Sequence, residues 1–222
     1  STLEDDLQGF ERQKLRIACS HLISDSYLPQ ILPKMMETFP ELLPHVFDLE
    51  AYDAYKKLLA RELDVVISIE KEPRSRNIET ITLLKLPQVV VVPKDHPAAH
   101  DFQWTNKALC YERWIALNEQ RGSMRPLCNK LSELSLTPSY GAITSSINSA
   151  LNYVAIGLGL GFMISPPKFL LEKHGLVAIA VPDAEDIELK LSYLPSDSQQ
   201  DVLDAFIAEA IMLAKKRQQD FL

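Results

Sequence analysis

Cysteine and long apolar runs are scarce in this chain, and each scarcity excludes a class of protein. The 222 residues include three cysteines, Cys19, Cys110 and Cys128, which are odd in number and far apart. This pattern argues against a disulfide framework and suits a reducing compartment. No apolar run approaches the roughly 20 residues that cross a bilayer. We therefore expect a cytoplasmic protein that makes no contact with a membrane.

Positive charge is also scarce, since 23 Lys and Arg are set against 30 Asp and Glu, for a formal net charge of −7. A protein domain that binds nucleic acid by itself needs a basic surface to contact the phosphates. The common catalytic and metal-binding patterns H-E-x-x-H, G-x-S-x-G, G-x-x-x-x-G-K and C-x-x-C are missing as well. We expect no catalysis, no metal, no cofactor and no direct DNA contact by these residues.

What the sequence does contain is a regular alternation of short apolar strands and amphipathic helices, the pattern of an α/β protein. Helices are expected at residues 26–39, 52–61, 124–134, 166–174 and 199–217. Strands are expected at residues 15–19, 45–49, 64–69, 114–117, 138–143, 160–164, 176–181 and 187–194, and the segment 78–93 is expected to be extended and interrupted by Pro87.

The order of these elements predicts two Rossmann-like subdomains with parallel strands and right-handed connections. The pattern starts again after residue 108, and the last strand and helix are expected to return to the first half. We place subdomain I at 13–92 and 187–222 and subdomain II at 93–186, joined by two crossover strands around a cleft. Residues 1–12 would be the end of a linker helix. The start of the sequence shows no signal peptide, and because it does not begin with Met, we expect a piece of a longer protein.

The stretch from Thr144 to Pro166 combines a polar loop, a helix capped by Ser145 or Ser146, three glycines and an apolar strand. A dinucleotide fingerprint follows a strand and opens a helix, whereas these glycines close a helix and open a strand. The glycines therefore predict a sharp turn. A serine-lined loop that feeds a helix N-terminus favours an anion.

Five segments together resemble the effector-binding domain of LysR-type transcriptional regulators. The resemblance covers nearly all of residues 15–215 and rests on five motifs: L-R-I-A-C-S (15–20), Y-L-P-Q-I-L-P-K-M-M-E-T-F-P (27–40), L-L-A-R-E-L-D-V-V-I-S (58–68), V-V-V-P-K-D-H-P (90–97) and V-A-I-G-L-G-L-G-F-M-I-S-P (154–166). It implies the two-lobed type II periplasmic-binding-protein-like fold. It also implies a homodimer of this domain, a homotetramer of the full-length protein, and DNA binding through an N-terminal winged helix-turn-helix outside this sequence.

The resemblance further implies a small-molecule effector held between the lobes by four loops. The matching positions are Ser20, His21, Leu22, Ile69, Gly122, Ser123, Ser145, Ser146 and Ile147. Family members often carry a hydroxyl where this chain has Leu22 and Ile69. The two apolar side chains favour an organic acid over a small inorganic anion.

Most of these residues also have an ordinary structural interpretation. Ser20, Ser123 and Ser145 could act only as helix caps, and His21 could be a solvated loop residue. An enzymatic pair would have to join Ser20 or Ser123 to His21, and the sequence identifies no acidic partner for it. The basic end of the last helix is explained by the helix dipole, and Met35 and Met36 belong to a core or to a dimer surface.

The function predicted from the sequence is therefore ligand sensing by the regulatory domain of a LysR-type regulator. The alternative is a secreted solute-binding protein whose signal peptide has been removed. The two hypotheses are distinguished by what precedes Ser1 in the gene. The sequence does not identify the effector or the regulated genes.

Overall fold

The chain forms two compact units, each built around one five-stranded sheet. The structure is a computed structural model that describes residues 13–69, 75, 77–100, 103, 112–117, 124–181, 184–195 and 200–218. Unit 1 ends at Leu84 and resumes from Glu188 to Arg217, and unit 2 runs from Lys85 to Ile187 and resumes at Gln218. Among the described helices, none has the length and hydropathy that a membrane span requires.

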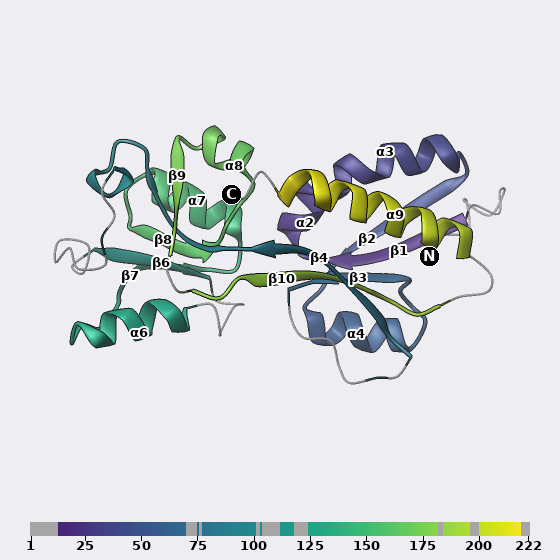
Figure 1. Cartoon of the computed structure of the whole chain (residues 1–222), viewed down its shortest axis with the longest axis horizontal. Helices are drawn as coiled ribbons and strands as arrows, with labels where there is room; N and C mark the ends of the chain where they lie inside the picture. The colour runs from purple at the N-terminus through teal and green to yellow at the C-terminus, as the bar shows by residue number, and fades with distance from the viewer. Residues whose placement is uncertain are drawn as a thin grey trace, which may run out of the picture. The chain divides into compact units, whose positions relative to one another are not determined.

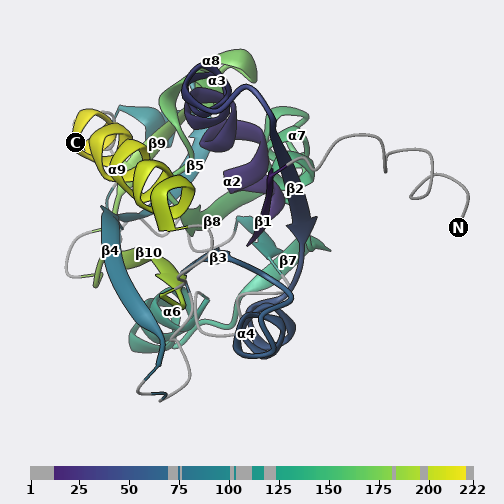
Figure 2. The same cartoon turned by 90° about the vertical axis from the view of Figure 1, so that its right-hand side faces the viewer.

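The sheet of unit 1 has the strand order β2-β1-β3-β10-β4. Its strands are β1 (Gln13–Cys19), β2 (Leu42–Asp48), β3 (Val65–Ser68), β4 (Glu79–Leu86) and β10 (Ile187–Tyr193), and its helices are α2 (His21–Ser26), α3 (Leu28–Thr38), α4 (Ala51–Leu59) and α9 (Gln200–Arg217). β1 runs parallel to both β2 and β3, as the alternation of strands and helices predicts, and β10 returns antiparallel to β3. Helices α3 and α9 cover one face of this sheet and α4 covers the other (Figures 1 and 2).

The expected helix at 26–39 is observed as α3, and a short helix that the sequence did not predict, α2, precedes it and is separated from it at Tyr27. The Tyr27 amide donates to the carbonyl of Ile23 and closes α2, and Tyr27 then caps α3, whose first turn contains Pro29. Proline fits the first turn because its missing N–H would have no partner there. The Tyr27 hydroxyl donates to the carbonyl of Ala210 at 2.8 Å, and the guanidinium of Arg217 lies 5.9 Å from its ring centre. Tyr27 therefore connects the start of α3 to α9 through a hydrogen bond and a cation–π contact.

The second strand starts earlier than expected because it includes Pro44. β2 is an edge strand, so a residue without an N–H can point its nitrogen away from the ladder. Most of the apolar stripe on α3 faces the interior of unit 1, where Leu28, Ile31 and Met35 are buried, while Met36 is half exposed. The core interpretation of this helix is thus supported for the buried residues.

The sheet of unit 2 has the strand order β7-β6-β8-β5-β9. Its elements are β5 (Gln88–Pro93), the 3-10 turn η1 (Pro97–Ala99), β6 (Arg113–Leu117), α6 (Arg125–Glu133), β7 (Ser139–Thr144), α7 (Ile147–Ala155), β8 (Leu160–Ile164), α8 (Lys168–Lys173) and β9 (Leu176–Ala180). β6 is parallel to β7 and β8, and β5 is antiparallel to β8 and β9. Helix α6 covers one face, and α7 and α8 cover the other (Figures 1 and 2).

The glycines after α7 serve a turn and close packing between this helix and β8, which confirms the predicted turn. Gly157 has φ +78°, a conformation that side chains with a Cβ rarely adopt. At Gly159 a Cβ would lie 2.5 Å from the carbonyl oxygen of Arg113, so a larger residue does not fit beside β6. Gly161 lies within β8, where a Cβ would come 3.2 Å from Cγ2 of Val154 on α7.

The two units divide earlier in the sequence than the expected boundary at residue 92. Pro87 separates β4 from β5, and β5 pairs with β8 and β9 in the sheet of unit 2. The compact units accordingly divide at Leu84, inside β4. The second division, at Ile187, lies next to the expected position at residue 186.

Candidate functional site

One group of predicted site residues lies at the carboxyl edge of the parallel strands of unit 1. In the strand register, Cys19 at the end of β1 is level with Asp48 on β2 and with Ile67 on β3. The three loops that follow these strands therefore start at one edge. Open α/β sheets bind their ligands at this edge. The structure brings four of the predicted residues there, namely Ser20, His21, Leu22 and Ile69.

Ser20 occupies the position before α2 but does not cap the helix with its side chain. Its backbone is extended, with φ −74° and ψ 159°, and its carbonyl accepts from the amides of Ile23 and Ser24. Its hydroxyl makes no capping hydrogen bond, and the residue is exposed. The capping interpretation therefore fails for the Ser20 side chain, and ligand contact remains a prediction.

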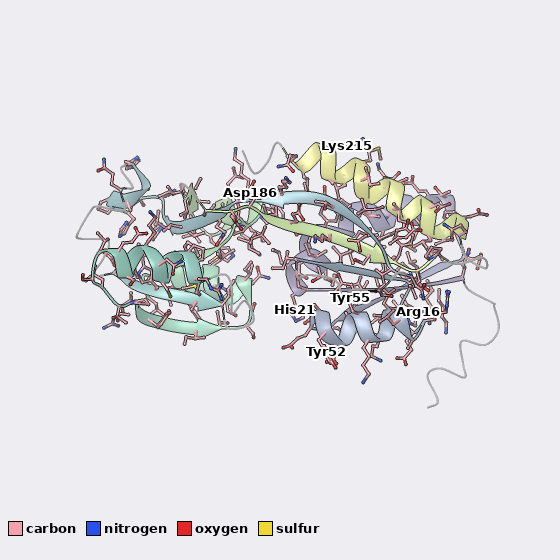
Figure 3. The ribbon with its side chains drawn as sticks, turned by 60° about the horizontal axis from the view of Figure 1, so that its bottom comes forward. Arg16, His21, Tyr52, Tyr55, Asp186 and Lys215 are labelled. Atoms are coloured by element: carbon pink, nitrogen blue, oxygen red, sulfur yellow. The ribbon has the colours of Figure 1, made fainter. Side chains whose placement is uncertain are left out.

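His21 is paired, rather than being a solvated loop residue. Its Nε2 lies 2.5 Å from Oδ2 of Asp48, and the two side chains are 70% and 45% exposed. Asp48 is thus the acidic partner that the sequence did not identify. Among the described residues no hydrogen bond joins Ser20 to His21, and Ser123, the other serine considered for such a pair, lies outside them. Figure 3 places His21 and Tyr52 at one end of unit 1 and Arg16 at the other.

The apolar residues Leu22 and Ile69 are both partly buried at this edge. Leu22 lies in the first turn of α2, where its carbonyl accepts from the Ser26 hydroxyl at 2.5 Å. Ile69 directly follows β3. Their intermediate burial leaves part of each side chain available for an apolar contact.

Another group of predicted residues lies at the carboxyl edge of the parallel strands of unit 2, where the loop after β7 starts α7. Ser146, and not Ser145, is the cap: its Oγ accepts from the amide of Ser149 at 3.3 Å. The Ser146 amide in turn donates to Oγ1 of Thr144 at 3.2 Å. Ser145 is exposed and Ile147 is the first residue of the helix. A helix of nine residues presents backbone N–H groups and the positive end of its dipole at this point.

Two predicted residues, Gly122 and Ser123, lie outside the described residues. They follow β6, whose last residue Leu117 is level with Thr144 on β7. The sequence also missed Asp48 and Tyr52, which lie at the end of β2 and in the first turn of α4. Tyr52 is 80% exposed. Asp48 is the last residue of the parallel strand β2 and Tyr52 lies shortly after it, and this position was the signal that could have identified them.

The side chains and backbone groups at these edges are suited to binding a small-molecule ligand. Within the described part of the chain, no group of three His, Cys, Asp or Glu side chains is arranged to hold a metal ion. Cys19, next to Ser20, is buried, and burial together with the carboxylates of Asp48 and Asp25 raises the pKa of its thiol to about 12. Such a thiol stays protonated at neutral pH and is a poor nucleophile.

The comparison with known families settles the classification. Residues 8–212 match the sequence model of the LysR substrate binding domain. The chain belongs to this family. The family consists of transcriptional regulators and not of enzymes, and its domains bind small-molecule effectors.

The relatives agree with this assignment. The transcriptional activator protein LysR of Escherichia coli K12 is 27% identical over 183 residues, which are 80% of this chain and 58% of LysR. The chain thus spans little more than half the length of that curated relative.

Two solved structures show the fold. The BenM effector binding domain with its effector benzoate is 15% identical, with a TM-score of 0.71 over 92% of this chain and 93% of that chain. The effector binding domain of QuiR in complex with shikimate is 17% identical, with a TM-score of 0.69 over 92% and 98%. At these identities the likeness concerns the fold alone, and it confirms the predicted two-lobed periplasmic-binding-protein-like architecture.

Proposed function

We propose that this chain is the ligand-sensing domain of a LysR-type transcriptional regulator and that its effector is an organic anion. The observation that carries the proposal is the family match over residues 8–212, combined with two sets of loops at carboxyl edges of parallel strands. Such edges are the usual ligand sites of α/β sheets.

The class of ligand follows from the chemistry of the loops. The α7 N-terminus, with Ser145 and Ser146, favours a negative charge by about 0.3–1 kcal/mol when exposed and by more when partly buried. Leu22 and Ile69 offer apolar contacts to a carbon skeleton. Benzoate and shikimate, the ligands of the two related domains described above, both combine a carboxylate with a six-membered carbon ring.

The regulatory step would be a change in the arrangement of the two units or of the subunits. A ligand shifts such an equilibrium only through its different affinities for the two arrangements. The peptide links between the units run through β4 and β10, so ligand contacts on both units would bias the geometry of these two strands. DNA binding would belong to the helix-turn-helix part of the full-length regulator.

Serine substitutions test the anion site. Ser145→Ala removes an exposed hydroxyl that caps nothing, so it should weaken binding of the effector with little change in melting temperature. Ser146→Ala is the matched variant, because it also removes the cap, which costs about 1 kcal/mol of stability. A thermal-shift screen of small organic acids would supply the effector, and isothermal titration would compare the variants. Unchanged affinity in both variants would exclude the α7 loop from the site.

The domain is also proposed to act as a homodimer, within a tetramer of the full-length protein. We infer that the helices α3 and α6 make the subunit contact, although both give most of their apolar side chains to their own cores. Met36 on α3 and Leu134 after α6 remain 48% and 40% exposed. Sedimentation of the wild-type domain and of the Met36→Lys and Leu134→Lys variants tests this contact. A monomeric wild type at high concentration would contradict it.

A further inference from the structure

The His21–Asp48 pair places one ring nitrogen of His21 beside the candidate ligand site and commits the other to the protein. Nε2 is the atom that meets Asp48, at 2.5 Å, and Nδ1 has no hydrogen-bond partner among the described residues. Both residues lie at the carboxyl edge of the sheet of unit 1, level with the end of β1. The histidine ring is 70% exposed, so Nδ1 is accessible from solvent.

An acidic partner at Nε2 determines what Nδ1 can do. A carboxylate only accepts hydrogen bonds, so the Asp48 contact requires a proton on Nε2. In the neutral ring, Nδ1 is then an acceptor and cannot bind a carboxylate. In the protonated ring, Nδ1 carries a second proton and donates it to an anion. The hydrogen bond to one nitrogen thus fixes the role of the other, as it does for metal-binding histidines.

The other charged groups near the pair are mostly acidic. Asp25 lies on α2, the helix that His21 begins. Cys19 is the last residue of β1, and the carboxylates of Asp48 and Asp25 both contribute to the raised pKa of its thiol. β2 and α3, the other elements that contact α2, carry the titratable residues His45, Lys34 and Glu37 in addition to Asp48. With a neutral His21 this edge would repel a carboxylate. Among these described groups Lys34 is a cation but pairs with Glu209 at 3.1 Å, so the protonated ring of His21 adds a positive charge beside the acidic groups.

We propose that Asp48 is a specificity-determining residue of the effector site and acts through His21: by holding Nε2, it makes Nδ1 the ligand contact, so that the site takes up one proton together with a carboxylate ligand. This inference rests on the proposed function, because it assumes that an organic anion reaches the loop after β1. It adds the coupling of effector binding to pH and the assignment of that coupling to one pair of residues.

Benzoate and benzamide are the probes that test the proposal, since they have the same ring and differ in charge. Benzoate stays ionised between pH 5.5 and 8.5, so any pH dependence in this range comes from the protein. Benzoate affinity should fall as pH rises, by up to about tenfold per pH unit, which is the limit for uptake of one proton. Benzamide affinity should stay constant. Amide NMR spectra of the domain report both the affinity and the residues that respond.

Three variants separate the pair from other effects. His21→Gln cannot take up a proton and should abolish the pH dependence of benzoate binding. Asp48→Ala frees Nε2, so a neutral ring can present an N–H to the ligand, and the pH dependence should become shallower through tighter binding at high pH. Asp25→Ala is the matched control, because it removes a nearby charge of the same sign on the same helix, and it should keep the wild-type slope.

The outcomes distinguish this inference from the proposed function. If benzoate shifts the amide signals of Ser146 but not of His21, or binds with equal affinity at all pH values, the proton-coupled role of the pair is excluded while the anion site remains. The proposed role of Asp48 is also excluded if Asp48→Ala leaves the pH dependence of benzoate affinity unchanged. If benzoate shifts neither Ser146 nor His21 at about 10 mM, a concentration at which even ligands with a Kd of 1 mM bind, both proposals are contradicted.

Discussion

Arg16 and Asp64 bind each other through side chain and main chain at once. The Asp64 carboxylate accepts from Nη2 of Arg16 at 2.7 Å, from its Nε at 3.1 Å and from its backbone amide at 2.7 Å. The Asp64 amide donates back to the Arg16 carbonyl at 2.9 Å. Arg16 lies on β1 and Asp64 immediately precedes β3, so the pair fixes where β3 starts beside β1. Figure 3 places Arg16 at the end of unit 1 away from His21.

Removing this carboxylate should destabilise unit 1. Asp64→Ala leaves a partly buried guanidinium and a backbone amide without their acceptor, and hydrogen bonds to charged groups contribute about 1.5–3 kcal/mol each in favourable cases. We expect a loss of about 2–3 kcal/mol in the unfolding free energy, measured by urea denaturation. The control is Glu62→Ala, which breaks the exposed pair of Glu62 with Lys57 and should change the midpoint little. Equal effects of the two substitutions would contradict the role given to Asp64.

The elements of the fold were predictable from the sequence where the apolar period was clean. The strand Leu160–Ile164 was predicted residue for residue, because it is a short apolar run between a glycine turn and a proline, and all five of its residues are buried. The helix α2 was missed, since its six residues are too few to show an apolar period, and Tyr27, whose hydroxyl contacts α9, separates it from α3. The strand β2 was started too late because proline was taken as a boundary, although an edge strand accepts it.

The candidate site was less predictable than the fold. The choice between Ser145 and Ser146 as the cap depends on one hydrogen bond to Ser149, and both serines fit the sequence pattern. The partner of His21 is 27 positions away in the sequence and becomes its neighbour only because β1 and β2 are parallel and in register. Contacts of this kind depend on topology, which local patterns do not contain.

The two glycines after α7 should respond differently to the same substitution. Gly157→Ala adds a methyl group that meets no atom within 4 Å, so its cost is the strain of a positive φ, about 1–2 kcal/mol. Gly159→Ala places the methyl group against a backbone oxygen of β6 and forces the turn to move. We expect a clearly larger loss of stability for Gly159→Ala in thermal denaturation. A larger loss for Gly157→Ala would show that the turn conformation, and not the approach to β6, dominates.

The Cys19 thiol should be unreactive in the folded protein. Burial, with the carboxylates of Asp48 and Asp25, raises its pKa to about 12 from an ordinary value near 9. The raised pKa stabilises the fold below pH 9, and this contribution is lost as pH rises toward 12. In a Cys110→Ser, Cys128→Ser background, Cys19 should react with a disulfide reagent at pH 8 only as fast as the protein unfolds. Rapid labelling of folded protein would contradict the burial of this thiol.

The hydrogen bond from Tyr193 to Glu79 should make the stability of the fold depend on pH in the alkaline range. The Tyr193 hydroxyl donates to Oε2 of Glu79 at 2.7 Å and joins β10 to the start of β4. This bond, followed by burial and by the negative charges of Glu79 and Asp204, raises the pKa of Tyr193 to about 12. A phenol whose pKa is raised on folding stabilises the protein fully below pH 10, its unfolded value, and loses this contribution as pH rises through 12.

The Tyr193→Phe variant tests this contribution directly. It should be less stable than wild type at pH 8, and the difference should shrink between pH 10 and pH 12 as wild-type Tyr193 ionises. Urea midpoints across this range measure the difference, and tyrosinate absorbance of the two proteins isolates the titration of Tyr193. In Glu79→Gln the hydrogen-bond acceptor remains while the charge is removed, so the titration should move to lower pH but stay above 10. A constant stability difference from pH 8 to pH 12 would show that the hydroxyl contributes by packing alone.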